Sequence, residues 1–390
     1  MNKLTKYACI LTTLAGAVAC SGGKKAQGDY AIIPLPQEVV TQGSAPFLLK
    51  PSTPISYQEG DAEMEQTARF LASYVKEATG YEPKVITGNA DKGIHLSIAS
   101  DIRNPEGYRL LVSENGIEIA GASNAGIFYG VQTLRKSIPA VAEGMDIELP
   151  AASINDYPRF PYRGMHLDVS RHFFPVDSVK KFIDILALHN MNRFHWHLTD
   201  DQGWRIEIKK YPELTQIGAQ RKETVIGRNS GKYDGKPYGE GMFYTQDEIR
   251  DVIAYAQERF ITIIPEIDLP GHQLAAITTY PDLGCTGGPY EVWTQWGVSD
   301  DVICAGNEKA MTFLEDVLGE VIDLFPSEYI HVGGDECPKV RWKSCPKCQA
   351  RIKAEGIKGD SKHTAEEYLQ SHVISRMEKF VESKGRHIIG

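Results

Sequence analysis

The sequence predicts an α/β protein: a (β/α) TIM-type barrel, truncated after the start of its fifth strand and preceded by a small α+β domain. Three observations support this fold class. From about residue 156 onward a buried strand, a loop and an amphipathic helix follow one another repeatedly, which is typical of a parallel sheet. Before that point, alternating and hairpin patterns are mixed with a helical face. Neither a G-x-G-x-x-G fingerprint nor a P-loop occurs, which disfavours a doubly wound sheet.

Residues 30–155 are expected to form the α+β domain. The stretch YRLLVSENGIEIAGA predicts a hairpin that turns at Asn115–Gly116. Upstream, Ala68, Leu71 and Val75 recur at helical spacing and predict one buried helix face. No cluster of residues in this domain suggests catalysis, so the candidate catalytic residues lie in the domain that follows.

Residues 156–390 are expected to form the barrel domain, and the boundary lies in the Pro-rich segment PAASINDYPRFPYRG. Four buried strands are predicted in GMHLDVS, RFHWHLTDD, ITIIPEID and EYIHVGGDE. Two of the helices begin with capping boxes, Thr245 to Glu248 and Thr364 to Glu367. The last helix leads into RHIIG, the expected opening of a fifth strand. Because a closed barrel needs eight strands, we expect either a fragment or a barrel completed by further residues.

Polar side chains stand at the end of each of the four predicted strands. In a parallel barrel the active site lies at the carboxyl ends of the strands, so these residues are the functional candidates. In chain order they are Asp168, Arg171, His172, His195, His197, Asp200, Asp201, Glu266, Asp268, His272, Asp335 and Glu336. A purely structural role is equally open for Asp168 and Glu266. His195 and His197 fit a metal-binding H-x-H pair or, as we expect, hydrogen bonding beneath the site with Trp196 between them.

The adjacent carboxylates Asp335 and Glu336 are the most informative of these candidates. Neighbours on a regular strand point to opposite faces, so both can face one pocket only if the strand ends there. Gly333 and Gly334 permit the necessary bend. Two carboxylates this close resist simultaneous ionisation, and the one that keeps its proton can act as a general acid. The pair therefore predicts acid catalysis, in which the second carboxylate stabilises positive charge.

The N-terminus predicts export. Lys3 and Lys6 precede an apolar run that ends in small residues at Cys20, which indicates a signal peptide over residues 1–20. The AVAC ending resembles a bacterial lipobox, so we expect lipidation of Cys20, followed by a linker over residues 21–29. An ordinary cleaved signal is the alternative, and the run is too short for a spanning helix. The lipid would anchor the protein in the bacterial envelope, in the periplasm or at the cell surface, without spanning the membrane.

The composition narrows the class of partner. The chain has 390 residues, of which 42% are hydrophobic, so it is long enough for two folded domains. Lys and Arg together number 42 against 51 for Asp and Glu, giving a net charge of -9. This charge disfavours nucleic acid and other polyanions as partners and leaves a neutral small molecule or a glycan.

Five cysteines follow the signal: Cys285, Cys304, Cys337, Cys345 and Cys348. Export to an oxidising compartment favours disulfides. We expect one between Cys285 and Cys304, which flank a loop rich in glycine. A zinc knuckle around CPKC at residues 345–348 would use Cys337 as well, but three thiols without a neighbouring histidine do not complete a set of ligands. A second disulfide, from Cys337 to Cys345 or Cys348, is therefore expected.

Six motifs along the chain together resemble glycoside hydrolase family 20, the β-N-acetylhexosaminidases. They are IIPLPQEV, GIFYGVQTLRKSI, DYPRFPYRGMHLDVSRHF, FHWHLTDDQGWRIEI, IIPEIDLPGH and HVGGDE, in the order of the family. The resemblance runs from about Tyr30 to the last residue. It implies an exo-glycosidase that removes terminal β-linked GlcNAc or GalNAc from glycans with retention and needs no cofactor or metal. In this family the substrate's 2-acetamido oxygen attacks C1 and forms an oxazolinium, an exception to the two-carboxylate scheme.

The resemblance also implies roles for individual residues. Glu336 matches the general acid, which later becomes the base that activates water, and Asp335 matches the residue that orients the acetamido nitrogen. Asp200 and His272 match the pair that supports the general acid through hydrogen bonds. Arg171 matches the arginine that grips sugar hydroxyls. The tryptophans, tyrosine and acidic residue that close the family's pocket lie on later strands and have no counterpart in this chain.

Two other functions are compatible with these motifs. One is a glycan-binding lipoprotein without turnover, and the other is a relative that releases disaccharides, such as a lacto-N-biosidase. The paired acid and stabiliser argue against the first, because binding alone requires neither. Trp293 and Trp296 can belong to an outer sugar subsite or to packing, and the loop over residues 226–244 can shape specificity or be a surface excursion. Neither the oligomeric state nor the preferred sugar is predicted.

Overall fold

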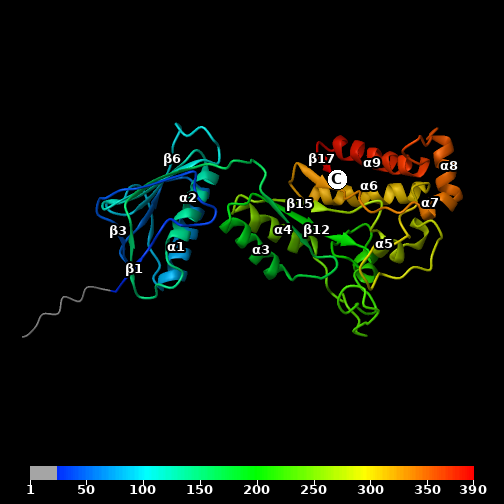
Figure 1. Cartoon of the computed structure of the whole chain (residues 1–390), viewed down its shortest axis with the longest axis horizontal. Coiled ribbons are helices and arrows are strands. Elements are labelled where there is room, and N and C mark those ends of the chain that lie inside the picture. The colour runs from blue at the N-terminus through cyan, green and yellow to red at the C-terminus, as the bar shows by residue number, and fades with distance from the viewer. Residues whose placement is uncertain (1–23) are drawn as a thin grey trace, which may run out of the picture.

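The computed structural model describes residues 24–390, which form two lobes joined by the segment after strand β10 (Figure 1). The expected signal peptide and Cys20 lie outside the described residues. Within residues 24–390, no helix combines the length and apolar character needed to cross a bilayer.

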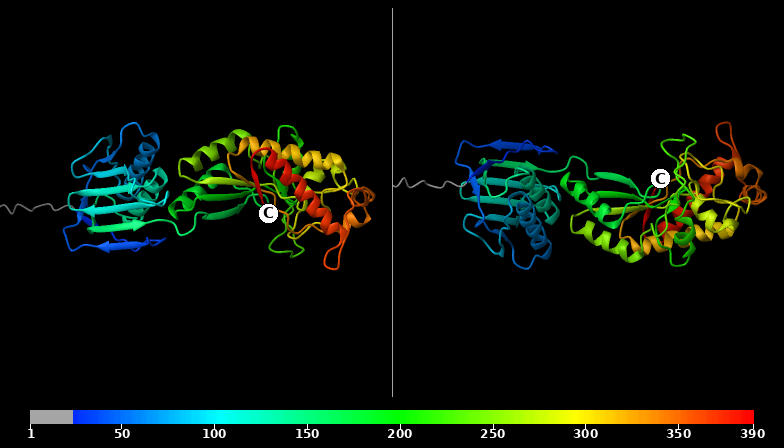
Figure 2. Two further views of the ribbon diagram at one scale, coloured as in Figure 1. Left: turned by 90° about the horizontal axis from the view of Figure 1, so that it is seen from above. Right: turned by 90° about the horizontal axis from the view of Figure 1, so that it is seen from below.

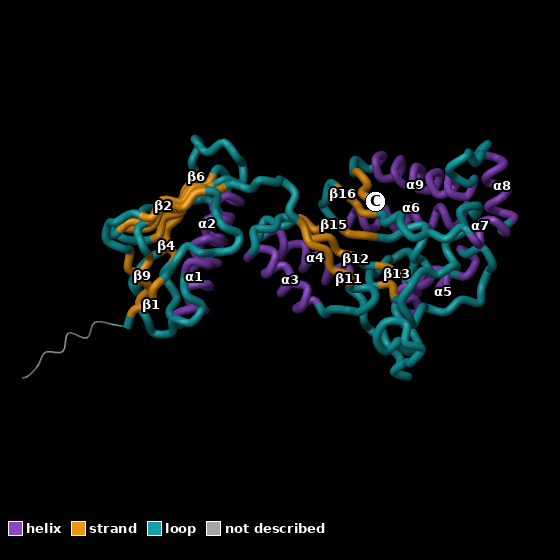
Figure 3. Tube along the Cα trace, viewed as in Figure 1, coloured by secondary structure: helices purple, strands orange, loops and turns teal. Residues whose placement is uncertain are grey.

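The N-terminal lobe contains a seven-stranded mixed sheet against which helices α1 and α2 pack side by side (Figure 3). The strand order is β2-β10-β7-β8-β6-β4-β5, and β1, β9 and β3 form a second sheet. The predicted face of α1 is buried, and the helix ends at Gly80, whose φ is 83°. The elements are β1 (Lys25–Gln27), β2 (Glu38–Thr41), β3 (Phe47–Leu49), β4 (Ile55–Tyr57), α1 (Ala62–Thr79), β5 (Val85–Thr87), β6 (Ile94–Ile98), β7 (Tyr108–Ser113), β8 (Gly116–Gly121), α2 (Asn124–Ser137), β9 (Asp146–Leu149) and β10 (Ala152–Asp156).

The predicted hairpin forms from β7 and β8, but its turn comes one residue earlier than expected. Ser113 pairs with Gly116, so Glu114 and Asn115 make the turn and Gly116 already belongs to β8. The glycine is needed for close packing instead, because a Cβ on Gly116 would lie 3.0 Å from the carbonyl oxygen of Gly93.

The C-terminal lobe is built on five parallel strands in the order β11-β12-β15-β16-β17. All four strands predicted from the sequence are present, and RHIIG forms the fifth, β17. Within residues 24–390 the sheet does not close into a barrel. The elements are β11 (Gly164–Asp168), α3 (Val176–Leu188), β12 (Arg193–His197), β13 (Thr199–Asp200), β14 (Gly203–Trp204), η1 (Leu214–Gly218), α4 (Gln246–Gln257), β15 (Thr262–Glu266), α5 (Leu274–Thr279), η2 (Pro281–Leu283), α6 (Glu308–Leu324), β16 (Tyr329–His331), α7 (Val340–Ser344), α8 (Pro346–Ala354), α9 (Ala365–Ser383) and β17 (His387–Ile389).

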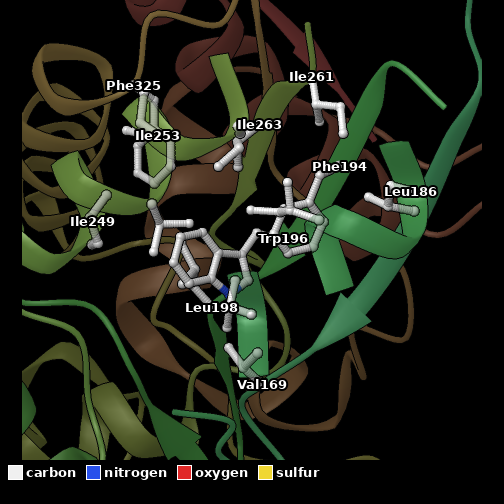
Figure 4. Close-up of a cluster of buried hydrophobic side chains, with 14 of the residues drawn as sticks. Val169, Leu186, Phe194, Trp196, Leu198, Ile249, Ile253, Ile261, Ile263 and Phe325 are labelled. Carbon is white, nitrogen blue, oxygen red and sulfur yellow. The ribbon is translucent and has the colours of Figure 1, made fainter. Parts of the chain in front are cut away.

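Strand β12 shows how the core fixes the orientation of the site. Phe194 and Trp196 are fully buried and pack among the aliphatic side chains of the hydrophobic cluster drawn in Figure 4. Because alternate residues of a strand face opposite sides of the sheet, His195 and His197 are turned the other way. A one-residue slip would turn the histidines into the hydrophobic cluster and the tryptophan toward the opposite face of the sheet. Both predicted capping boxes form, at the starts of α4 and α9, and they define where these helices begin.

The connecting segment crosses between the two lobes (Figure 2), and polar and aromatic contacts join the lobes there. The guanidinium of Arg163 donates to both carboxylate oxygens of Glu106, at 3.0 and 2.9 Å, and the amide of Asn192 donates to the same carboxylate at 3.0 Å. The rings of Phe128 in α2 and Phe260 lie 5.5 Å apart between centroids. These contacts connect the N-terminal sheet to the ends of the barrel strands opposite the site described next.

Candidate active site

A cavity of about 840 Å³ opens at the carboxyl ends of the parallel strands. Four of the five residues expected to act on a sugar line it, namely Arg171, His272, Asp335 and Glu336. The fifth, Asp200, has a side chain that is fully buried and lies beneath the cavity floor. The structure therefore brings together side chains that lie up to 165 positions apart in the sequence, as the parallel-strand argument predicts.

The bend after β16 places both adjacent carboxylates in the cavity. The strand ends at His331, and Gly333 and Gly334 follow with φ values of 64° and 101°. A Cβ on Gly333 would overlap the carboxylate of Asp268, so the chain can pass there only as glycine. Glu336 itself has a φ of 44°, a left-handed conformation that is uncommon outside glycine. The predicted end of the strand and the predicted bend are both confirmed.

His272 links Glu336 to two buried carboxylates. Its Nε2 lies 3.3 Å from Oε2 of Glu336, and its Nδ1 lies 3.0 Å from oxygens of both Asp200 and Asp201. The imidazole side chain is 2% exposed, whereas the Glu336 side chain is 57% exposed. A buried chain of hydrogen bonds therefore ends at a carboxyl group that a ligand can reach.

Arg171 is held by carboxylates on both sides. Its two terminal nitrogens each lie 2.7 Å from a carboxylate oxygen, one of Asp168 and one of Asp200, and its Nε donates to Gln202 at 3.1 Å. The same Asp168 side chain accepts hydrogen bonds from the backbone amides of Ser170 and Arg171. The two roles left open for Asp168 are thus combined, because it caps a turn and also positions the guanidinium.

In the cavity wall Glu266 accepts hydrogen bonds from two histidines, and a third lies close to it. Its carboxylate lies 2.6 Å from both His195 and His197 and 3.1 Å from His331. The other ring nitrogen of His197 lies 2.7 Å from Asp200. Both nitrogens of His197 therefore face carboxylates, so both donate and the ring is an imidazolium. The expected hydrogen bonding of His195 and His197 is confirmed, but both residues line the cavity instead of lying beneath it.

The ionisable groups in and beneath the cavity wall have strongly shifted pKa values. Burial alone would lower the pKa values of His197 and His272, but hydrogen bonds to carboxylates outweigh it and raise them to about 10 and about 11. Burial opposes ionisation of Asp200 and Glu266 as well, yet their histidine partners hold both pKa values below the usual range. Asp268 lacks such a partner, so burial raises its pKa to about 8. Of these five groups, all but Asp268 are charged at neutral pH.

Comparison with known proteins identifies the family. The family model described as "Glycosyl hydrolase family 20, catalytic domain" matches residues 160–390. A second model, "Glycosyl hydrolase family 20, domain 2", matches residues 29–157. The chain belongs to glycosyl hydrolase family 20. The resemblance read from the six sequence motifs is thereby confirmed at the level of the family.

Relatives in family 20 share about two fifths of the aligned sequence. The chain is 40% identical to the β-hexosaminidase of Porphyromonas gingivalis, over 100% of this chain and 49% of the relative. It is 39% identical to the β-hexosaminidase of Vibrio furnissii, over 88% of this chain and 54% of the relative. The chain thus spans about half the length of these curated relatives.

Solved structures of the family share the fold. The exo β-N-acetylglucosaminidase of Vibrio harveyi in complex with N-acetylglucosamine superposes with a TM-score of 0.78 at 34% identity, covering 92% of this chain and 54% of that one. The β-N-acetylhexosaminidase of Streptomyces coelicolor gives 0.77 at 33% identity, covering 94% and 67%. These family 20 relatives place the C-terminal lobe among TIM-barrel catalytic domains and the N-terminal lobe as the domain before it.

Sequence reasoning missed two histidines of this family 20 site. His166 and His331 line the cavity, and His331 contacts Glu266. The signal was available, because His166 lies two residues before Asp168 and therefore on the same strand face. Sequence reasoning also singled out Asp200 as the partner of His272, whereas Asp201 lies equally close to that histidine.

The disulfide predicted between Cys285 and Cys304 is wrong. Both are free thiols, as are the three other cysteines of the described residues. The sulfur of Cys304 lies 3.7 Å from those of Cys345 and Cys348, and the sulfur of Cys285 lies 3.8 Å from that of Cys348. A disulfide needs about 2.05 Å. The alternative pairing through Cys337 is also absent, since that residue stays free near the bend after β16.

The loop over residues 226–244 lies beside the cavity, where it and the residue before it contact the loop that carries Trp293 and Trp296. The amide of Val225 donates to the carbonyl of Thr294 at 2.8 Å, and the amide of Trp296 donates to the side chain of Asn229 at 3.1 Å. The ring of Trp296 is 42% exposed and lies 5.8 Å from the Arg171 guanidinium. Both alternatives for the tryptophans and for the loop over residues 226–244 therefore stay predictions.

Proposed function

We propose that the protein containing this chain is an exo-acting β-N-acetylhexosaminidase, which removes terminal β-linked GlcNAc or GalNAc from glycans. The hydrogen-bonded chain from Asp200 through His272 to the exposed Glu336 carries this proposal, because it sets a proton donor at the mouth of a sugar-sized cavity. The family 20 relatives named β-hexosaminidase support it, as does the Vibrio harveyi enzyme with its bound N-acetylglucosamine.

In the proposed mechanism Glu336 protonates the leaving oxygen while the substrate's acetamido oxygen attacks C1. The product is an oxazolinium, and Asp335, on the same cavity wall, holds the acetamido nitrogen and stabilises the charge that develops there. Water activated by Glu336 then opens the ring with net retention. The positively charged His272 stabilises Glu336 in the interval when it has given up its proton, because its Nε2 lies 3.3 Å from the carboxylate.

Arg171 is proposed to bind hydroxyl groups of the terminal sugar. Asp168 and Asp200 fix the guanidinium from two directions at 2.7 Å, so its orientation is set before substrate arrives. Such fixed donors lose little freedom on binding. We also propose that strands from outside these 390 residues complete the barrel and the cavity wall, since an eight-stranded barrel needs them and the relatives are about twice as long.

Export and lipid anchoring are proposed from the N-terminal sequence alone. Lys3, Lys6 and the AVAC ending at Cys20 support a lipoprotein of the bacterial envelope that meets glycans outside the cytoplasm. Replacing Cys20 by Ser should release the protein from the membrane fraction, and labelling with a palmitate analogue should be lost at the same time. Membrane association that persists in Cys20→Ser would contradict this.

The function is tested with aryl β-N-acetylglucosaminide and β-N-acetylgalactosaminide as substrates of the full-length protein. We expect turnover of at least one of them, inhibition by a thiazoline analogue of the oxazolinium, and a loss of about 10³-fold in kcat for Glu336→Gln. The 390-residue form, assayed beside it, measures the contribution of the further strands. A folded full-length protein that releases neither sugar would overturn the proposal and point to disaccharide release or to binding without turnover.

A further inference from the structure

Four cysteines from three separate segments meet away from the active-site cavity, and we call them the four-cysteine cluster. Cys285 follows η2, Cys304 precedes α6, and Cys345 and Cys348 stand at the start of α8. Their sulfur atoms all lie within 4.8 Å of one another, and none of the four residues lines the cavity. Three are buried and Cys285 is half-buried. We propose that the four-cysteine cluster is a structural zinc site.

Three of the six distances between the sulfurs match a tetrahedron around one metal ion, and the others stay within 4.8 Å. In a tetrahedral site with Zn–S bonds of about 2.3 Å, neighbouring sulfurs lie about 3.8 Å apart. Cys304 lies 3.7 Å from both Cys345 and Cys348, and Cys348 lies 3.8 Å from Cys285. Thiolates at this spacing with no oxygen ligand among them are the donor set that zinc prefers over calcium or magnesium.

Two disulfides would arrange the same atoms differently. They would divide the four sulfurs into two close pairs at about 2.05 Å. In the structure Cys304 is instead equally distant from Cys345 and Cys348, and Cys348 is nearly as close to Cys285 as to Cys304. A sulfur with two equidistant neighbours belongs to a shared centre and not to a pair.

The chain around the cluster has the local features of a metal knuckle. Cys345 and Cys348 are separated by two residues, with Cys345 at the N-cap of α8 and Pro346 in the first helical position. Across from them, a Cβ on Gly306 would lie 2.1 Å from the backbone of Lys347, so only glycine permits this approach.

Metal binding at the four-cysteine cluster involves no redox change. Four thiols release four protons to solvent, and one Zn²⁺ gains four bonds to sulfur. The ion would join the loop before α6 to α7 and α8, in parallel with the Asp301–Arg341 ion pair at 2.7 Å and the Trp342 indole donating to the carbonyl of Ile303 at 2.9 Å. Since α7 follows the catalytic bend directly, the site would hold in place the segment that leaves Glu336.

The first test is the zinc content of the full chain purified without chelator, measured by mass spectrometry of the elements. We expect about one zinc per chain, lost at least about fivefold in Cys304→Ser and Cys348→Ser. Cys337→Ser is the matched control, since this cysteine is buried but outside the cluster, and it should keep its zinc. Zinc content that is the same in all the variants would mean adventitious binding and would overturn the proposal.

The second test uses the unaltered protein and so does not depend on whether a variant folds. After removal of metal under reducing conditions, Co²⁺ alone should produce the intense absorption of a tetrahedral thiolate site. The bound ion should also protect the four thiols from alkylation. A protein without zinc whose mass is about 4 Da below that of the reduced chain would contain two disulfides and would refute the site. Four freely alkylated thiols with no zinc and no cobalt spectrum would refute it equally.

Discussion

Replacing Asp268 by Asn should stabilise the protein increasingly as the pH rises. Burial raises the pKa of Asp268 from 3.8 to about 8, so between these values the folded state retains a proton that the unfolded chain has released. The wild-type protein therefore loses stability from this group as the pH rises through that window. Asparagine resembles the protonated acid in shape, and its oxygen can still accept the hydrogen bond from the Gly334 amide, 3.3 Å away.

The magnitude follows from the shift. At about 1.4 kcal/mol for each unit of pKa, the full displacement corresponds to about 6 kcal/mol, and we expect about 3 kcal/mol because water and nearby dipoles relax around a buried charge. For a domain of this size that is about 6 °C in Tm. Thermal unfolding of Asp268→Asn and wild type should give a difference in Tm that grows from pH 4.5 to pH 8.5. Asp323→Asn, at an exposed position in α6, serves as the control. A difference that does not change with pH would refute the reasoning.

Three further predictions concern binding, backbone and core. Arg171→Lys cannot contact two carboxylates at once, so KM for an aryl glycoside should rise about tenfold in steady-state kinetics, and an unchanged KM would contradict the proposed grip. Gly333→Ala should lower kcat about 100-fold, because the added Cβ has no room beside Asp268. Gly356 has a similar φ and open space around it, so Gly356→Ala should leave kcat unchanged. Equal losses of kcat in the two variants would mean that backbone strain alone explains the effect. Trp196→Ala should lower the free energy of unfolding in urea by about 3–5 kcal/mol, because the indole is fully buried. Trp296→Ala, at an exposed position, should lower it by less than about 1 kcal/mol. Similar losses in the two variants would mean that burial does not determine the loss of stability.

Much of the fold could be predicted because its signals are local. Thr245 with Glu248, and Thr364 with Glu367, mark helix starts within four residues, and both capping boxes form as expected. The alternation around Trp196 likewise determines which side of β12 faces the core. The position of the β7–β8 turn was harder, because the glycine that resembled a turn residue is required by contact with a distant backbone atom.

The candidate site was predictable for a different reason. Arg171, His272 and Glu336 come from different strands, but parallel strands end at one edge, so their meeting follows from topology. The cysteines had no such rule. Cys285 and Cys304 join CPKC from positions more than 40 residues earlier in the chain, and spacing along the chain does not tell which distant thiols will meet. Counting Cys337 with CPKC gave three ligands, whereas the structure replaces it with two others.

The two charged imidazoles beneath the cavity affect how kinetic data on this enzyme class should be read. An inflection near pH 6.5 in a rate profile is commonly assigned to a histidine. Here His197 and His272 keep their protons until about pH 10 and about pH 11, so neither changes charge across the physiological range. An inflection near pH 6.5 is therefore not to be assigned to either of these two histidines. His197 and His272 therefore stay positively charged near neutral pH, a role that lysine or arginine side chains usually have.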